Sequence, residues 1–248
     1  MNIITDEAKT ALISGYTYTD PCQFIVIDNF FQEEIANRAY RTLLDFNFSN
    51  ADYKSVDLKF ENNKYAFKNN LGPFFDSVFE YLHSDEFIDY IESLTGIKNI
   101  IRNDTHLAGA GIHQTHSGGF LNVHTDFNTY VSEKYGRLDR RINLLIYLNP
   151  DWCDDYKGDL FMCDKTTMTA KYKIPPIFNR CVIFNTTQNS LHGHPFPLKT
   201  PEGVYRQSIA VYYYTKNVNY PYDFEGRKNS SVFYYFTPYI DFSGAKTL

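Results

Sequence analysis

The chain has 248 residues, 43% of them hydrophobic and 17% aromatic, a composition that indicates a folded protein and excludes intrinsic disorder. Its formal net charge of −5 argues against a nucleic-acid partner, because nucleic-acid-binding proteins usually present a basic face. No apolar run approaches the length of a membrane span, so no membrane partner is expected.

The four cysteines show neither a C-x-x-C spacing nor a compact framework, which predicts free thiols in a reducing compartment. They are Cys22, Cys153, Cys163 and Cys181. The N-terminal segment has no basic region followed by an apolar one, so we expect no secretion signal and a cytoplasmic location.

A chain of this length can bury one sizeable core, and no linker divides it, so a single domain over residues 1–248 is expected. Residues 1–102 would provide a supporting strand and helices, residues 103–215 a β core, and residues 216–248 a C-terminal extension. The fold class predicted is mainly β with flanking helices (α+β).

The first predicted elements are a strand and a helix. Residues 22–28 predict the strand, and Asp28 or Asn29 would then cap a helix that continues to about Phe46. One face of this helix would carry Ile35, Ala39, Leu43 and Leu44.

A polar segment and two further helices follow. Residues 52–71 are rich in Asn and Lys, which predicts an irregular, exposed segment. Residues 73–82 and 85–94 have helical periodicity and predict two amphipathic helices that pack against a sheet, the second ended by Thr95 and Gly96.

Short strands separated by Gly, Pro and Asn turns fill the β core, and this pattern is typical of a sandwich or jelly roll. The pair Gly118 and Gly119 predicts a turn before the first of them. The runs expected as strands are 120–123, 141–150, 158–162, 180–185, 191–195 and 205–214.

His124 and Asp126 follow the first of these strands and project the same way, because strand side chains alternate with period two. A histidine from a distant strand, His192 or its rival His194, would complete a two-His-one-carboxylate facial triad. Such a triad fills one face of octahedral Fe(II) and leaves the other open. The His-x-Asp triplet alone is a weak signal, and its weight comes from the surrounding strands.

These residues resemble the iron(II)/2-oxoglutarate-dependent dioxygenases and, within them, the prolyl-4-hydroxylase-like branch. The resemblance runs from the first strand to Tyr214, with Lys157-Gly158-Asp159-Leu160 as a mild departure from a Gly-Gly-Glu-Leu-like strand start. It implies a double-stranded β-helix with N-terminal helices packed on one sheet. It also implies oxidative decarboxylation of 2-oxoglutarate to succinate and CO2, coupled to hydroxylation of a C–H bond. Its most specific pieces are residues 111–114, 118–128, 141–152, 192–195 and 206–208.

The resemblance also implies roles for single residues. The family motif places the metal on the first histidine of His-x-His-Pro, which selects His192 over His194 as the third ligand. Arg206 would bind the distal carboxylate of 2-oxoglutarate, since a guanidinium matches a carboxylate with two hydrogen bonds. Ser208 and Tyr147 could donate hydroxyl groups to the same carboxylate, with ordinary core packing as the alternative for Tyr147. No catalytic side chain is expected beyond the metal centre.

His113, Phe127 and Trp152 are candidate substrate contacts, and Asn143 is a candidate contact to the co-substrate. His113 and His116 together suggest a second metal site, but no complete ligand set accompanies them. Structural or substrate-contacting roles are therefore expected for both.

The expected cofactors are Fe(II), 2-oxoglutarate and O2, with ascorbate as a candidate reductant. The substrate favoured is a prolyl residue in a peptide or protein, with a free amino acid or another small metabolite as the alternative. A cupin-like metal-binding module or isomerase would not need Arg206 and Ser208, and a non-catalytic jelly-roll binding module would tolerate loss of the triad. The sequence predicts no oligomeric state.

Residues 128–139 form a polar run that we expect to be too long for a tight hairpin. A mobile lid over the metal site, selecting the substrate, is the functional interpretation. A solvated connector is the alternative.

Overall fold

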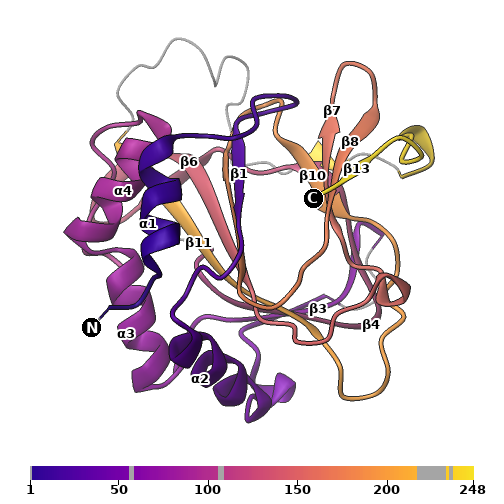
Figure 1. Ribbon diagram of the computed structural model, residues 1–248, viewed down its shortest axis with the longest axis horizontal. Coiled ribbons are helices and arrows are strands. Elements are labelled where there is room, and N and C mark those ends of the chain that lie inside the picture. Colours follow the sequence, from indigo (N-terminus) through magenta and orange to yellow (C-terminus); the bar gives the residue numbers. More distant parts are fainter. Residues whose placement is uncertain (1, 56–58, 106–108, 217–232, 235–236) are drawn as a thin grey trace.

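The computed structural model describes residues 2–55, 59–105, 109–216, 233–234 and 237–248 (Figure 1). A curled sheet with the strand order β1-β9-β6-β11-β4-β10-β7-β8-β13 forms its body, and β3, β5 and β12 pair with strands of this path. The strands are β1 (Phe24–Ile27), β2 (Tyr53–Ser55), β3 (Glu61–Phe67), β4 (Gly111–Thr125), β5 (Thr129–Ser132), β6 (Gly136–Tyr147), β7 (Leu160–Asp164), β8 (Thr169–Ile174), β9 (Arg180–Asn185), β10 (Leu191–His194), β11 (Arg206–Lys216), β12 (Phe233–Tyr234) and β13 (Lys246–Thr247).

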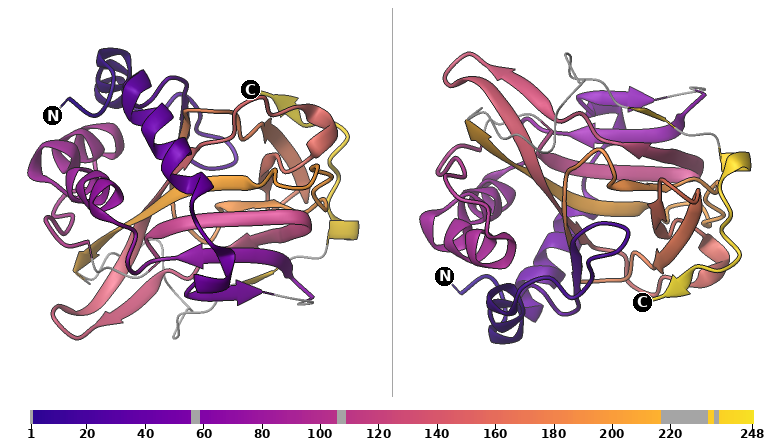
Figure 2. Two further views of the ribbon diagram at one scale, coloured as in Figure 1. Left: turned by 90° about the horizontal axis from the view of Figure 1, so that it is seen from below. Right: turned by 90° about the horizontal axis from the view of Figure 1, so that it is seen from above.

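The four α-helices of the described ranges pack on one side of this sheet, as Figure 1 and Figure 2 show. They are α1 (Asp6–Ser14), α2 (Glu33–Leu44), α3 (Pro73–Leu82) and α4 (Asp85–Thr95). Their apolar faces meet residues of β1, β6, β9 and β11 in the largest hydrophobic cluster, to which β6 contributes Ile142, Leu144 and Ile146. The expected class, mainly β with helices on one sheet, is confirmed.

The helices α3 and α4 are confirmed with nearly the bounds that the sequence predicts. Pro73 occupies the first turn of α3, where its missing N–H is harmless. Ser84 caps α4 by accepting a hydrogen bond from the backbone N–H of Phe87 at 3.3 Å. Gly96 ends α4 in the left-handed conformation, with φ at 71°, which glycine adopts without strain.

The predicted cap of α2 is wrong. The helix begins at Glu33, because Asp28 is engaged by Arg180 through hydrogen bonds of 2.6 and 2.9 Å and Asn29 adopts a positive φ of 52°. Leu44, expected on the buried face, is 60% exposed. Helix α1, whose N-terminus is capped by Thr5, is not predicted from the sequence.

The expectation of an irregular segment at residues 52–71 is wrong as well. Within it β2 pairs with β3, and β3 pairs with β4 along most of its length. On one side Lys64 and Ala66 face the pocket described below, and on the other Tyr65 and Phe67 pack in or against the largest hydrophobic cluster. The first three residues of β3 are Glu and Asn, so the apolar alternation is too short to predict a strand.

Two predicted loops are also parts of strands. Gly118 and Gly119 lie inside β4, where the register against β3 shifts and Gly118 has a φ of 76°, so they form a bulge and not a chain reversal. Residues 128–139 contain the hairpin β5–β6, with Thr129 paired to Asp139 and Ser132 to Gly136. The hairpin contradicts the view that this run is too long for a tight connection, and the lid role stays a prediction.

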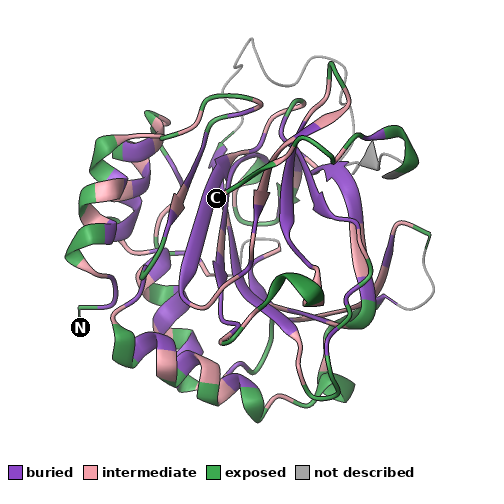
Figure 3. Ribbon diagram, turned by 45° about the vertical axis from the view of Figure 1, so that its right-hand side comes forward, coloured by how far each residue is buried: buried purple, intermediate pink, exposed green. Residues whose placement is uncertain are grey.

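Buried residues follow the central strands, while the outer faces of the helices are exposed (Figure 3). The C-terminal strand β13 runs parallel to β8 and closes that edge of the sheet. All four cysteines are free, and Cys153 alone among them is exposed. Within the described ranges, no helix is long and apolar enough to cross a membrane.

Candidate metal centre

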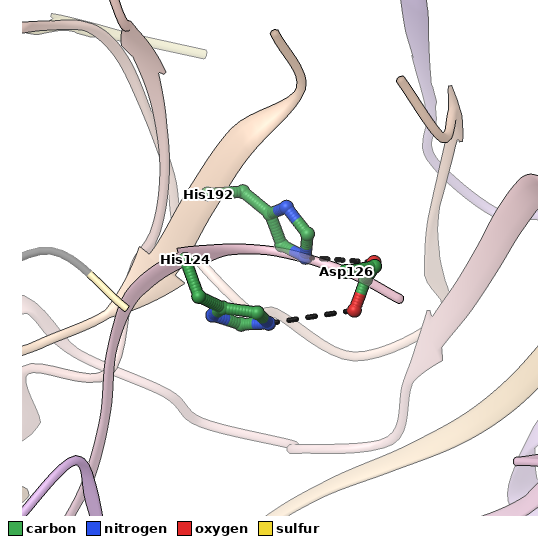
Figure 4. A group of neighbouring side chains, drawn as sticks. All are labelled: His124, Asp126 and His192. Carbon is green, nitrogen blue, oxygen red and sulfur yellow. Dashed lines mark ion pairs between the residues drawn. The ribbon is translucent and has the colours of Figure 1, made fainter. Parts of the chain in front are cut away.

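The end of β4 and the short strand β10 bring together the residues of the predicted triad. His192 of β10 lies directly opposite His124 of β4 in the antiparallel register. Asp126 follows two residues after His124, and its Oδ1 lies 3.5 Å from His124 Nε2, while its Oδ2 lies 3.5 Å from His192 Nε2 (Figure 4). All three side chains are buried, and their potential ligand atoms lie within 4.8 Å of one another. The structure therefore clusters the three residues that the sequence selects.

Hydrogen bonds fix which nitrogen of each imidazole faces the cluster. His124 Nδ1 lies 2.8 Å from the carbonyl of Asn122, and His192 Nδ1 lies 2.9 Å from the carbonyl of Ser190. A carbonyl only accepts, so each Nδ1 carries the proton and each Nε2 presents its lone pair to the shared space. Burial lowers the pKa of His192 to about 4, so this imidazole is neutral near pH 7 and able to bind a metal.

Asp126 is held in its ionised form by its neighbours. Burial alone would raise the pKa of this carboxyl group, but the Arg140 guanidinium holds it well below its usual range. Arg140 Nη2 lies 3.1 Å from Asp126 Oδ2, and Asn143 Nδ2 donates a hydrogen bond of 2.6 Å to the same oxygen. The cluster therefore offers two neutral nitrogens and one carboxylate, a donor set suited to Fe(II).

Gly193 lets β10 approach β4 closely enough to form this cluster. A Cβ at position 193 would lie 2.8 Å from the carbonyl oxygen of Asn122 and 2.8 Å from the Cα of Val123. Both are backbone atoms, so any side chain at position 193 would force the two strands apart. The separation of His192 from His124 thus depends on the glycine that follows His192.

The cluster lines a pocket of about 260 Å³ that also contains Arg206 and Ser208. Arg206 is buried, and its guanidinium donates to the carbonyl of Gly158 at 2.7 Å and to the hydroxyl of Tyr147 at 3.2 Å. No carboxylate among the described residues forms an ion pair with it. Ser208 lies two residues further along β11, beside His113 of β4 and Tyr147 of β6 in the register.

Tyr147 supports this arginine from the side of the sheet. Its hydroxyl accepts the hydrogen bond from Arg206, and the Arg206 guanidinium carbon lies 4.9 Å from the centre of its ring. Tyr147 is fully buried but does not line the pocket itself. Tyr147 thus contacts Arg206, the residue predicted to bind the carboxylate, and does not reach the pocket itself.

Two further histidines line the pocket outside the triad. His194 is buried, its Nδ1 has no hydrogen-bond partner, and burial holds its pKa well below the usual range. At His113, burial and the charges of Lys64, Arg140 and Arg206 lower the pKa to about 3. Both imidazoles are therefore neutral hydrogen-bonding groups near pH 7.

The other predicted contacts are divided between the pocket and the surface. Phe127 lines the pocket, but Trp152 lies outside it, where its Nε1 donates to the carbonyl of Lys157 at 3.0 Å. His116 stacks on Tyr205 with ring centres 4.2 Å apart and does not face the pocket. Asn143, expected at the co-substrate, lines the pocket and donates a hydrogen bond to Asp126.

Sequence reasoning missed Arg140, which is fully buried beside the triad. Its guanidinium carbon lies 4.6 Å from the ring centre of Phe127 and 3.4 Å from that of Tyr212. Arg140 and Arg141 are adjacent in an alternating strand, so one of them had to face inward. That alternation is the signal that could have identified it.

Comparison with known proteins finds one family model that matches the β core and several solved structures that share the fold. Residues 110–214 match the family model of the 2OG-Fe(II) oxygenase superfamily. The chain is similar to a prolyl hydroxylase from Trichoplax adhaerens, solved with a peptide fragment of the hypoxia inducible factor oxygen degradation domain (18% identity, 85% of this chain and 88% of that one, TM-score 0.53). It is also similar to a Pseudomonas putida prolyl-4-hydroxylase (13% identity, 83% and 98%, TM-score 0.57).

A third similar structure is HygX from Streptomyces hygroscopicus, solved with nickel and 2-oxoglutarate (12% identity, 86% of this chain and 88% of that one, TM-score 0.52). No curated protein matches the chain. At these identities the likeness establishes the fold, and the expected double-stranded β-helix is confirmed.

Proposed function

We propose that this chain is a 2OG-Fe(II) oxygenase that hydroxylates a prolyl residue of a peptide or protein, because residues 110–214 match the model of that superfamily and the fold is that of the prolyl hydroxylases. The observation that carries the proposal is one pocket lined by both the His124–Asp126–His192 cluster and the guanidinium of Arg206. A metal-binding module without 2-oxoglutarate chemistry has no need for such an arginine.

His124, Asp126 and His192 are proposed as the ligands of Fe(II). The two imidazoles present Nε2, and the carboxylate is ionised, so all three donors are in the form that a metal requires. When bound, iron(II) supplies the oxidative decarboxylation of 2-oxoglutarate and the hydroxylation of a C–H bond. The protein residues orient the reactants and shield them from water.

Arg206 is proposed to bind the distal carboxylate of 2-oxoglutarate, with Ser208 as a second donor. The guanidinium is a buried cation whose hydrogen bonds go to neutral oxygens, and a carboxylate would compensate its charge. His194 Nδ1, buried without a partner in the same pocket, is a further group that a bound anion or its hydrogen-bonding atoms would satisfy. The pocket therefore fits the co-substrate.

A prolyl substrate is supported by two features. Phe127 and Leu121 add apolar surface to the pocket near the cluster, which suits a pyrrolidine ring. Two structures that share the fold are prolyl hydroxylases, one of them solved with a peptide. His113 and Phe127 are the residues we propose as substrate contacts.

The test is a turnover assay with Fe(II), ascorbate and 2-oxoglutarate, in which succinate is measured with and without a library of proline-containing peptides. We expect succinate formation that rises with some peptides and a mass gain of one oxygen on their proline. The His124→Ala variant should form none above background, while a surface variant such as Lys9→Ala should match the wild type. Stimulation by free amino acids but by no peptide would move the substrate to the small-molecule class. Absence of any Fe(II)-dependent succinate would refute the proposal.

A further inference from the structure

We propose that Arg140 is a positioning residue for the metal centre. Together with Asn143, it holds Oδ2 of Asp126, so that Oδ1 is the oxygen that binds the metal. This inference rests on the proposed function, because it assumes that Asp126 is a metal ligand. Arg140 lines the same pocket, but in this role it acts through Asp126 and contributes no ligand atom to the metal.

Two donors converge on one oxygen of Asp126. Asn143 Nδ2 donates to Oδ2 at 2.6 Å, and Arg140 Nη2 lies 3.1 Å from the same atom. Oδ1 lies 3.5 Å from His124 Nε2 and Oδ2 lies 3.5 Å from His192 Nε2, so it is the two donors on Oδ2 that distinguish the oxygens. Such an arrangement favours a carboxylate that binds a metal through one oxygen while the other is fixed by the protein.

The donors are themselves fixed by contacts that do not involve Asp126. Arg140 Nε and Nη2 donate to Asn143 Oδ1 at 3.0 and 2.6 Å, and Thr186 Oγ1 donates to the same oxygen at 3.3 Å. Because Asn143 Oδ1 accepts these bonds, its Nδ2 must point toward Asp126. The guanidinium also lies against the rings of Phe127 and Tyr212.

An alternative role for Arg140 makes the opposite prediction. If Arg140 were only a counter-ion for Asp126 in the metal-free protein, it would compete with the metal, and its removal would tighten metal binding. If it positions the carboxylate, its removal should weaken metal binding. Its hydrogen bonds to Asn143 favour the second role, because they remain when Asp126 binds a metal through Oδ1.

The experiment is titration of the metal-free protein with Mn(II), followed by calorimetry, without 2-oxoglutarate or O2. We expect Arg140→Met to weaken Mn(II) binding about 10- to 100-fold, the usual effect of removing a group that orients a metal ligand. Arg140→Lys should restore part of the loss, since one ammonium group cannot serve both Asp126 and Asn143. The matched control is Arg141→Met, a buried arginine of the same strand that does not line the pocket.

Asn143→Leu is the second variant, for the case that Arg140→Met does not fold. This substitution removes the shorter of the two contacts to Asp126 Oδ2 and should also weaken Mn(II) binding. In addition, the visible absorption spectrum of bound Co(II) should change, because the geometry of the carboxylate changes. Unchanged or tighter binding in the folded variants would overturn the inference while the wild type still binds metal. If the wild type binds no metal, the proposed function fails as well.

Discussion

Replacing Arg206 with methionine removes the only positive charge that we assign to the distal carboxylate of 2-oxoglutarate, while it preserves much of the length of the side chain. Arg206 is 6% exposed, so water cannot replace its interaction with the carboxylate. Removing one partner of a buried, hydrogen-bonded charge pair lowers affinity by about 2–5 kcal/mol. At about 1.4 kcal/mol for each factor of ten, the dissociation constant of 2-oxoglutarate should rise about 30- to 4,000-fold.

The same substitution also has a smaller effect on stability. The Gly158 carbonyl and the Tyr147 hydroxyl lose the donors that bind them at 2.7 and 3.2 Å. Loss of hydrogen bonds to buried acceptors should lower the free energy of unfolding by about 1–3 kcal/mol. Tyr147→Phe is the matched control, because it removes one of these contacts and keeps the charge of Arg206.

The assay is anaerobic binding of 2-oxoglutarate to the protein loaded with Mn(II), with the metal titration run in parallel. Arg206→Met should lose co-substrate affinity and keep its metal affinity within about threefold, since Arg206 contributes no ligand atom. Tyr147→Phe should weaken co-substrate binding less than about tenfold, because its hydroxyl acts only through one hydrogen bond to Arg206, which keeps its charge. Unchanged 2-oxoglutarate affinity in a folded Arg206→Met variant would refute this reasoning.

Three further predictions concern the histidines and the thiols. His192→Ala should abolish Mn(II) binding, whereas His194→Ala should retain most of it, and equal losses in the titration would contradict the choice of His192 as ligand. The pKa of His113 is lowered to about 3, so between about pH 6.5 and pH 3 the unfolded chain binds a proton that the folded protein does not, and stability falls as the pH falls. Between pH 7 and about pH 5 this proton binding should lower the free energy of unfolding by about 2 kcal/mol. His113→Asn should therefore make the free energy of unfolding of the metal-free protein less pH-dependent. An unchanged pH dependence would contradict the lowered pKa of His113. Iodoacetamide should label Cys153 quickly in the native protein and the other three thiols only after unfolding, and mass spectrometry of the peptides checks this.

The sequence predicts those parts of the fold whose patterning reflects burial. Residues 73–82 and 85–94 have one apolar face and clear end signals, so both helices are predicted with nearly their true bounds. The strand β3 is not predicted, because one of its faces lines a polar pocket, where Lys64 replaces the apolar residue that a strand pattern would show. A functional surface thus removes the very signal from which strands are predicted.

The site is predictable to different depths for different residues. The spacing of His124 and Asp126 on a strand indicates a shared face, and the structure brings His192 to them. Strand alternation indicates that one of Arg140 and Arg141 faces inward but does not select Arg140, and its role depends on contacts with residues from other parts of the chain. The hairpin within residues 128–139 is hidden in the sequence because its polar composition resembles that of a loop.

Gly193 would allow the spacing of the proposed metal ligands to be adjusted from a position that contributes no ligand. Its missing side chain sets how near two strand backbones lie, and the strands in turn carry the two imidazoles. Gly193→Ala would move β10 slightly away from β4, because the added methyl group needs space between the two backbones. The substitution would therefore change the spacing of the ligands without changing their identity. Protein engineers who wish to shift the preference of such a centre between ions of different radius have, in this one position, a steric control that leaves the chemistry of the donors intact.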